Sequence, residues 1–346
     1  MSIISSDEIF MRAALREARR GLGRTSPNPA VGAVLVDGGK IIAKGHHRKA
    51  GAPHAEIECL RDLRKAVPKN AALYVTLEPC STTARTGPCT AAIIEAGVRR
   101  LVVGATDPNP LHAGRGVSLL RKAGLEVRTG VLEDECSALN EAFNKWITTK
   151  RPFVIAKCGM SLDGRLSRPP GETRWITSAA SRRHARQLRA RVDAILIGAE
   201  TLRADNPRLT VRGPRGAKQP WRVVLSRSGS LPRQAHLFTD RFAERTIVYG
   251  HKDLSVILRE LGQKEITSVL IEGGGEILGQ ALDQRLVDKV QLYLGPVITG
   301  GPSVGFAGAG MAATREAPKL KGIRYKKIGQ DVCVTGYPTY DEIRSE

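Results

Sequence analysis

The sequence of 346 residues is poor in features that define several large classes of protein. It has no uninterrupted apolar run of about 18 residues, the length that a membrane-spanning helix requires. Its first residues lack the charged start and apolar block of a secretory signal. Its six cysteines are scattered, with no dense disulfide framework. We therefore expect a cytoplasmic protein without a membrane partner, in which paired cysteines are more often metal ligands than disulfides.

Aromatic and acidic residues are also scarce. Aromatic residues make up 4% of the chain, and 34 acidic side chains face 54 basic ones, which gives a net charge of +20. The excess is +7 over residues 1–150 (22 basic, 15 acidic) and +13 over the remainder. Such a charge can indicate nucleic acid, phosphorylated small molecules or only a solvated basic surface. Because aromatic residues on which bases could stack are not interleaved with the basic ones, we expect no specific nucleic-acid partner.

The segment from His54 to Cys89 carries the most specific chemical signal. His54-Ala55-Glu56 is followed by Pro79-Cys80 and, after eight residues, by Cys89, itself preceded by proline. One imidazole and two thiolates form a three-ligand zinc site that leaves a position open for water, whose pKa zinc lowers to about 7. A carboxylate two residues after the histidine suits a proton shuttle. This combination is the pattern of zinc deaminases, although their common form ends in Cys-x-x-Cys and the second gap here is wider.

Each residue of this segment also has an ordinary explanation. Taken singly, either cysteine could be a buried core residue, His54 a helix cap, and the two cysteines a disulfide. Their order, together with Glu56 and both prolines, favours zinc. The assignment sets a geometric condition, because positions i and i+2 of a regular helix do not share a face. His54 and Glu56 can converge only if His54 lies in the irregular first turn of a helix.

The length predicts two domains, and the alternation of expected strands and helices predicts an α/β protein. We place the join at Lys150-Arg151-Pro152, which gives domains 1–149 and 150–346. A strand over 268–272 runs into three glycines and then a helix over 276–282, which can bind a phosphate or simply make a tight turn. The other expected helices cover 6–20, 55–63, 90–96, 116–123, 133–148, 178–191, 199–204 and 254–261. The other expected strands cover 30–36, 40–43, 72–76, 100–104, 125–129, 153–157, 194–198, 222–225, 246–249, 287–294, 323–328 and 332–336.

Further motifs carry a resemblance along nearly the whole chain. They are Pro27-Asn28-Pro29, His47, Thr76-Leu-Glu-Pro-Cys80, Asp107-Pro-Asn-Pro110, Lys157-Cys-Gly159-Met-Ser161-Leu-Asp163-Gly164, Trp175-Ile-Thr177 and Ala204-Asp205-Asn206-Pro207. In this order, and with eight residues between the cysteines, the chain resembles the bifunctional riboflavin-biosynthesis deaminase–reductases. The resemblance implies an α/β protein: an amino-terminal cytidine-deaminase-like α/β/α sandwich and a carboxy-terminal dihydrofolate-reductase-like α/β domain.

The resemblance also implies the chemistry. The first domain would deaminate 2,5-diamino-6-(5-phosphoribosylamino)pyrimidin-4-one with zinc. The second would use NADPH to reduce the ribose of 5-amino-6-(5-phosphoribosylamino)uracil to a ribityl chain. Phosphoribosylated pyrimidines would therefore be its small-molecule partners, and we expect a homo-oligomer.

The site residues follow from the matching motif positions. His54, Cys80 and Cys89 would hold zinc and Glu56 would move protons. NADPH would be contacted by Gly159, Trp175, Thr201, Asp205, Gly274, Gly275, Glu276, Ile277, Leu278, Gly279 and Gln280, and by either Ser226 or Arg227. Substrate would be contacted by Asn28, His47, Arg85, Thr173, Arg189, Leu209, Arg212 and Glu272. Proton handling in the reductase is left open among Lys157, Asp205 and Glu272.

The chain departs from the family pattern in one loop. Members often have His-x-Gly after the Cys-Ser pair, where this chain has Thr82, Thr83 and Ala84, and Gly87 replaces a proline. The histidine belongs to the substrate-facing loop, whereas the zinc ligands and Arg85 are kept, so deamination is still expected. Two other hypotheses stay open: a nucleic-acid deaminase, such as a tRNA-editing enzyme, and a binding or regulatory protein with degenerate sites. The wide cysteine gap and the whole second half argue against the first, and the intact ligand set argues against the second.

Overall fold

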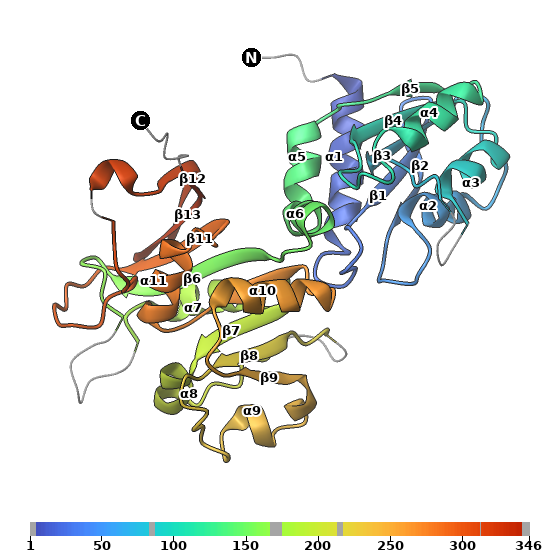
Figure 1. The fold of residues 1–346 in the computed structure, drawn as a ribbon. Coiled ribbons are helices and arrows are strands. Elements are labelled where there is room, and N and C mark those ends of the chain that lie inside the picture. The colour runs from blue at the N-terminus through green and yellow to red at the C-terminus, as the bar shows by residue number, and fades with distance from the viewer. Residues whose placement is uncertain (1–4, 83–86, 167–174, 213–216, 312, 341–346) are drawn as a thin grey trace, which may run out of the picture. The chain divides into compact units, whose positions relative to one another are not determined.

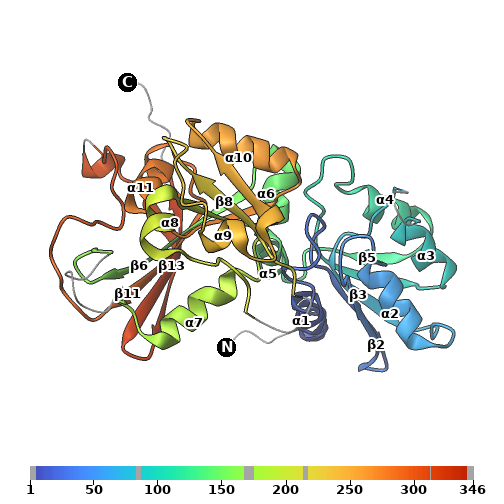
Figure 2. The same ribbon diagram turned by 90° about the horizontal axis from the view of Figure 1, so that it is seen from below.

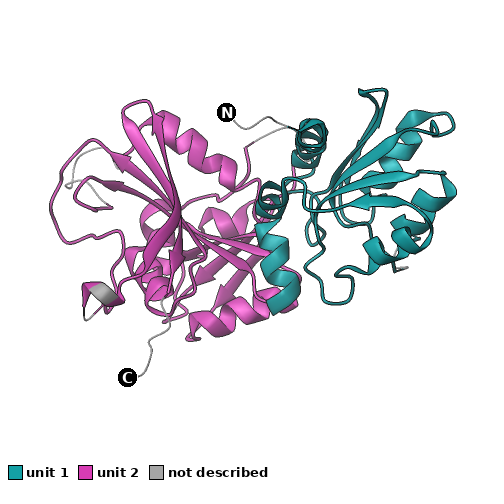
Figure 3. Cartoon of the chain, turned by 90° about the horizontal axis from the view of Figure 1, so that it is seen from above, with its two compact units in different colours: residues 1–150 teal, residues 151–346 magenta. Residues whose placement is uncertain are grey.

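The computed structural model describes residues 5–82, 87–166, 175–212, 217–311 and 313–340. The chain divides into two compact units, Met1–Lys150 and Arg151–Glu346 (Figure 3). None of the helices in the described ranges combines the length and hydropathy that a membrane crossing requires.

Unit 1 is built on a five-stranded sheet of order β2-β1-β3-β4-β5 (Figure 1). β1 pairs antiparallel with β2 and β3, whereas β3, β4 and β5 run parallel. The strands are β1 (Gly32–Asp37), β2 (Lys40–His46), β3 (Ala72–Leu77), β4 (Arg100–Ala105) and β5 (Glu126–Arg128). The helices are α1 (Ser6–Arg19), α2 (Ala55–Leu63), α3 (Cys89–Glu95), α4 (Arg115–Lys122), α5 (Glu133–Leu139) and α6 (Glu141–Thr149).

Both faces of this sheet are covered, because successive side chains of a strand point to opposite faces and each face has its own helices. Leu35 and Leu73 belong to the core that includes residues of α2, α3 and α4. Val34 and Tyr74 belong to the core on the other face, with residues of α1 and α5. The expected α/β/α sandwich is confirmed.

Unit 2 contains an eight-stranded sheet of order β12-β13-β11-β6-β10-β7-β8-β9. The six strands from β11 to β9 are parallel, and the β12–β13 hairpin adds to β11 in the antiparallel sense. The strands are β6 (Phe153–Ser161), β7 (Ala194–Gly198), β8 (Trp221–Leu225), β9 (Thr246–Tyr249), β10 (Ser268–Ile271), β11 (Lys289–Gly295), β12 (Lys319–Ile328) and β13 (Asp331–Thr339). The α-helices are α7 (Ala179–Leu188), α8 (Ala199–Asp205), α9 (His236–Thr239), α10 (Leu254–Gln263) and α11 (Gly275–Asp283).

Helices also cover both faces of this sheet (Figures 1 and 2). Leu258 of α10 and Leu278 of α11 pack into one core. Leu202 of α8 and Leu237 of α9 pack into the core on the opposite face, and Ala185 of α7 packs beside Tyr293. A mostly parallel sheet that ends in an antiparallel hairpin, with helices on both faces, confirms the expected dihydrofolate-reductase-like domain.

Some boundaries differ from the expectation. The single helix predicted over 133–148 was wrong: α5 and α6 meet at Asn140, whose φ of −113° and ψ of 26° interrupt the helix. The short helix α9 was not predicted, because four residues carry no periodic signal. β6 continues beyond residue 157 to Ser161, since β11 pairs with it over that length.

Candidate functional site

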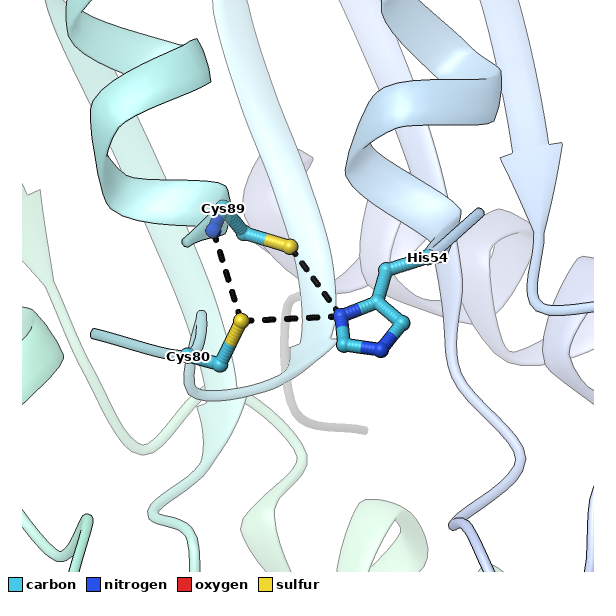
Figure 4. Close-up of side chains that lie close together, drawn as sticks. All are labelled: His54, Cys80 and Cys89. Carbon is cyan, nitrogen blue, oxygen red and sulfur yellow. Dashed lines mark hydrogen bonds between the residues drawn. The ribbon is translucent and has the colours of Figure 1, made fainter. Parts of the chain in front are cut away.

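His54, Cys80 and Cys89 converge in unit 1 (Figure 4). One ligand atom from each lies within 4.8 Å of the others. His54 Nδ1 is 3.2 Å from Cys89 Sγ and 3.5 Å from Cys80 Sγ. Zinc bonds of about 2.0–2.3 Å separate neighbouring tetrahedral ligands by about 3.5 Å. The three side chains therefore have both the chemistry and the spacing for one zinc ion.

Element ends bring the three residues together. Cys80 follows β3, Cys89 is the first residue of α3, and His54 is the N-cap of α2. The backbone of His54 is extended (φ −73°, ψ 166°), so the condition set by the sequence is met and Glu56 can face the same site. The backbone N–H of Cys89 donates to Cys80 Sγ at 3.3 Å. A helix N-terminus stabilises negative charge, which suits a metal-binding thiolate.

Burial and hydrogen bonding set the protonation of these groups. The hydrogen bond that Cys89 donates lowers the pKa of Cys80 to about 4, and the same contact together with burial raises the pKa of Cys89. Metal binding requires cysteine as the thiolate, a form that the lowered pKa of Cys80 favours. Glu56 is 3% exposed, and burial raises its pKa to about 7. A carboxyl group with such a pKa can both accept and donate a proton near neutral pH.

His47 and Asn28 form a hydrogen-bonded pair beside this centre. His47 Nδ1 lies 3.0 Å from the carbonyl oxygen of Pro53, and Asn28 Nδ2 lies 3.2 Å from His47 Nε2. A carbonyl only accepts and an amide nitrogen only donates, so Nδ1 of His47 carries the proton and Nε2 accepts. Burial lowers the pKa of His47, in keeping with a neutral ring. The His47 and His54 rings meet edge to face with centroids 5.2 Å apart. Arg85 lies outside the described residues.

Sequence reasoning missed a buried carboxylate at this end of the sheet. Glu78, two residues before Cys80, is 4% exposed. It accepts hydrogen bonds from the backbone N–H groups of Asp107, Gly114 and Val117 at 2.9–3.2 Å. Its position in the Leu-Glu-Pro-Cys motif was visible, but its partners lie about 30 to 40 positions away along the chain. Glu78 thereby ties the segment before α4 and the first turn of α4 to the segment that carries Cys80.

A second group of candidate residues lies at the carboxyl ends of parallel strands in unit 2. β10 ends at Ile271, and the glycine turn leads into α11 with Gly274 at φ +74°. A Cβ atom on Gly273 would lie 2.9 Å from the Thr201 side chain, and one on Gly275 would lie 2.1 Å from the Val304 carbonyl oxygen. The sequence pointed to Thr201 and to this turn separately, and the structure brings them together. The small glycines let the turn pack against Thr201 and Val304. The start of α11 that follows offers backbone N–H groups, which suit the phosphates of a dinucleotide.

The other expected cofactor residues differ in accessibility. Trp175 is 45% exposed, and the Arg182 guanidinium lies 4.5 Å from its ring centroid. Leu278 is 1% exposed and part of the core, so its side chain faces away from solvent. Ser226 is 1% exposed, and its hydroxyl has no hydrogen-bond partner within the described ranges. Gly279 is also buried, and a Cβ atom on it would overlap the Ala307 carbonyl oxygen. Asp205, Glu276 and Gln280 are exposed, and Gly159 and Ile277 are intermediate.

Arg189 and Glu272 form a bidentate ion pair. Arg189 Nε donates to Oε1 at 2.7 Å and Nη2 to Oε2 at 2.9 Å, and the side chains are 16% and 9% exposed. Burial alone raises the pKa of Glu272, but Arg189, Lys157 and Arg186 outweigh it and hold the pKa below its ordinary value. Arg189 is thus engaged by protein, whereas Arg186, one turn earlier, has no ion-pair partner among the residues described here. Arg186 lies in the last turn of α7 and Arg189 is its C-cap, and only the structure shows that their surroundings differ.

Two more expected substrate residues are visible. Leu209 is 2% exposed and has a φ of +50°, a conformation that side chains other than glycine rarely adopt. Strain of this kind gathers at ligand sites. Arg212 is exposed, and it is among the cations that, after burial, lower the pKa of Arg186. Thr173 lies outside the described residues.

Two known protein families match the chain. Residues 4–105 match the cytidine and deoxycytidylate deaminase zinc-binding region, and residues 152–334 match the RibD C-terminal domain. The first match contains all three converging ligands, and the second contains the glycine turn and the Arg189–Glu272 pair.

Full-length relatives and solved structures agree with these matches. The riboflavin biosynthesis protein RibD of Synechocystis is 40% identical over 96% of both chains, and that of Escherichia coli is 37% identical over 95% of this chain and 98% of its own. The structure of Acinetobacter baumannii RibD (form 1) superposes with a TM-score of 0.88 at 36% identity, covering 96% of this chain and 99% of its own. The Thermotoga maritima diaminohydroxyphosphoribosylaminopyrimidine deaminase/5-amino-6-(5-phosphoribosylamino)uracil reductase superposes with a TM-score of 0.89, also at 36% identity and with the same coverage.

Proposed function

The chain belongs to the RibD family of riboflavin biosynthesis proteins, and from this premise we propose how its residues divide the work. It is a bifunctional enzyme, a zinc-dependent deaminase and an NADPH-dependent reductase of riboflavin biosynthesis. We assign deamination to residues 1–149 and reduction to residues 150–346. Its substrates would be the two phosphoribosylated pyrimidines after which the Thermotoga maritima deaminase/reductase is named, taken in that order.

Deamination would be carried by the residues around the zinc ligands. His54, Cys80 and Cys89 would hold zinc, which when bound supplies a water molecule of lowered pKa. Glu56, whose raised pKa lies near neutrality, would take a proton from water and return protons to the ring nitrogen and the departing ammonia. Asn28, whose amide nitrogen is held by His47, would present its amide oxygen to a donor on the pyrimidine. Arg85 would contact substrate from the neighbouring loop.

Reduction would be carried by the second group. NADPH, which supplies a hydride when bound, would lie along the glycine turn from Gly274 to Gln280, with Thr201, Asp205, Gly159 and Trp175 beside it. The hydroxyl of Ser226 is buried and has no hydrogen-bond partner in the part of the chain that the structure describes, which supports a further polar contact to the cofactor. On the substrate side we retain Thr173, Leu209, Arg212 and the Arg189–Glu272 pair.

The substrate phosphate needs a cation that is not already neutralised. Glu272 engages Arg189 in a bidentate pair, whereas Arg186 forms no ion pair among the described residues, although it lies within electrostatic reach of Glu272 and of other arginines. We therefore add Arg186 to the phosphate contacts and give Arg189 the task of holding Glu272. Lys157, Asp205 and Glu272 remain the candidates for proton handling. Lys157 contributes to the lowered pKa of Glu272, so these two groups lie within electrostatic reach of each other.

Two further expectations belong to this proposal. We expect the enzyme to act in the cytoplasm as a homo-oligomer, and to have no specific nucleic-acid partner. The small aromatic fraction supports the last expectation, because it leaves few surfaces on which bases could stack. tRNA and DNA should then bind weakly and lose affinity steeply with salt. A tight, sequence-selective complex at physiological salt would contradict this.

The observation that carries the proposal is the convergence of His54, Cys80 and Cys89 next to buried Glu56. The test is to measure zinc per chain, ammonia released from the diamino-pyrimidine and NADPH oxidised with the deaminated product, all on one preparation. About one zinc per chain and both activities are expected. Zinc removal by a chelator should stop ammonia release and leave NADPH oxidation unchanged. Deamination by a zinc-free preparation would overturn the ligand assignment.

A further inference from the structure

Asn140 makes an unusual contact at the break between α5 and α6. Its Oδ1 accepts from the backbone N–H of Ala30 at 2.8 Å, and its Nδ2 donates to the carbonyl oxygen of Ala30 at 3.0 Å. Asn140 is 5% exposed and Ala30 is 3% exposed. One amide side chain therefore satisfies both polar groups of a buried residue 110 positions away. In an unbroken helix, Asn140 would have helical backbone angles and would not lie at this junction.

Ala30 lies two residues after Asn28 in a segment that is held at successive points. The backbone N–H of His47 donates to the carbonyl oxygen of Val31 at 3.0 Å, and Thr76 Oγ1 accepts from the N–H of Gly32 at 3.2 Å. Asn28 donates from its side chain to His47, and His47 bonds to the residue that precedes His54. Asn140 is thus the first member of a chain of direct contacts that leads to the zinc ligands.

We propose that Asn140 is a positioning residue of the deaminase, which fixes the backbone of Ala30 so that Asn28 and His47 meet the pyrimidine in the right place. This inference rests on the proposed function, because it assumes that Asn28 and His47 contact substrate. Asn140 itself touches neither the substrate nor the metal ligands. A bidentate amide restrains both translation and rotation of the peptide that it binds, which a single hydrogen bond does not do.

The chain offers a matched control. Asn144 lies one turn further along, in α6, and is partly buried. Its Nδ2 donates to the carbonyl oxygen of Ser137 at 3.0 Å, a contact that stays within the α5–α6 segment. Asn144→Ala removes the same chemical group from the same region but leaves Ala30 untouched. Any effect that Asn140→Ala has beyond that of Asn144→Ala therefore reports on the bond to Ala30.

The experiment compares wild type, Asn140→Ala and Asn144→Ala as full chains. In Asn140→Ala, kcat/KM for deamination should fall roughly 10- to 100-fold, mainly through a higher KM, because small displacements of binding groups have effects of this size. Zinc per chain and reductase activity should stay at the wild-type level. Hydrogen exchange of peptides that cover residues 25–32 should become faster. Asn144→Ala should change none of these.

Other results would overturn the inference. If Asn140 has only a structural role, Asn140→Ala should lower zinc content and apparent kcat together and leave KM unchanged. Equal KM values in Asn140→Ala and Asn144→Ala would also exclude a positioning role. If Asn140→Ala does not fold, Asn140→Asp, which keeps the acceptor and loses the donor, decides the question by the same measurements. Asn28→Ala separates the two proposals. If it leaves deamination unaffected, the proposed role of Asn28 fails. If it lowers deamination while the Asn140 variants do not, only the positioning role fails.

Discussion

The two units present their candidate sites in different ways. In unit 1, His54, Cys80 and Cys89 converge at the ends of helices and a strand, and the buried carboxyl group of Glu56 lies in the first turn of α2. In unit 2, the candidate site is made up of the glycine turn, the Arg189–Glu272 ion pair and the arginines of α7. The net charge is +13 in unit 2 and +7 in unit 1. If the proposed assignments hold, a metal site is recognisable from a short sequence motif, whereas a site for a large anionic cofactor is distributed over many residues of the chain. Single substitutions should therefore have their largest effects in unit 1 and smaller ones at the spread contacts of unit 2.

The largest effect is expected when Glu56, the proposed proton carrier of the deaminase, is replaced. Glu56→Gln keeps the shape of a side chain that is 3% exposed but cannot exchange protons. We expect deamination to fall about 1,000-fold, within the range for loss of a general acid–base. Reduction of deaminated substrate should change little, since Glu56 belongs to unit 1 and the proposed reductase residues belong to unit 2. Steady-state assays of both reactions check this. If a folded, zinc-replete variant lost both activities, the assignment of the two reactions to different units would be wrong.

The buried ion pair of unit 2 predicts a large effect on stability. Glu272→Gln leaves the Arg189 guanidinium buried without its charge partner, which should destabilise unit 2 by about 3 kcal/mol at neutral pH. Hydrogen exchange of amides in β6 and β10 measures this locally. The exposed Lys252–Glu260 pair provides the control, since Glu260→Gln should change exchange little.

The Arg189–Glu272 pair also predicts that the free energy of unfolding depends on pH. The pKa of Glu272 in the folded protein lies below its ordinary value of 4.5, so the folded protein binds this proton less readily than the unfolded chain. The stabilisation is therefore fully present above about pH 4.5 and is lost as pH falls through the folded pKa. The difference in unfolding free energy between wild type and Glu272→Gln should shrink on acidification. A difference that stays constant down to about pH 3 would show that the charge of Glu272 does not matter.

Substitution of Arg186 should have a smaller effect, which concerns the KM of the reductase. If it contacts the substrate phosphate, Arg186→Ala should raise the KM of the reductase about ten-fold with kcat nearly unchanged, which corresponds to one charge-assisted hydrogen bond. The effect should diminish with added salt. Arg183→Ala is the matched control, because Arg183 is exposed on the same helix. Equal KM values for the two variants would return the phosphate to Arg189 and Arg212.

The smallest effect concerns the choice of nicotinamide cofactor. NADPH carries a 2′-phosphate that NADH lacks, and no acidic residue stands about twenty positions after the glycine turn to favour the free ribose hydroxyl. We expect a preference for NADPH that narrows as ionic strength rises. Specificity constants for both cofactors at two salt concentrations measure it. Equal constants at low salt would show that the basic excess of unit 2 has no part in this choice.

Sequence reasoning reached the parts of the molecule that depend on local pattern. The convergence of His54, Cys80 and Cys89 was predictable because residue type and spacing carry the chemistry, and the α/β alternation predicted both sheets. The break at Asn140 was not predictable, because the bonds that accompany it reach Ala30, 110 positions away. The pairing of Arg189 rather than Arg186 with Glu272 depends on tertiary geometry for the same reason. Glu78 stands within a recognisable motif, but its hydrogen bonds to backbone N–H groups of a segment far along the chain could not be predicted from that motif.

The closeness of Cys80 and Cys89 has a consequence for the sensitivity of the enzyme to oxidation. A thiolate held next to a second cysteine is the arrangement from which sulfenic acids and disulfides form most readily. Zinc and oxidants therefore compete for the same two sulfur atoms. Whenever zinc leaves, oxidation can fix the site in a form to which the metal no longer returns. We therefore expect oxidants to inactivate the deaminase at a rate set by zinc release and to affect the reductase less, because Cys158 and Cys333 are buried.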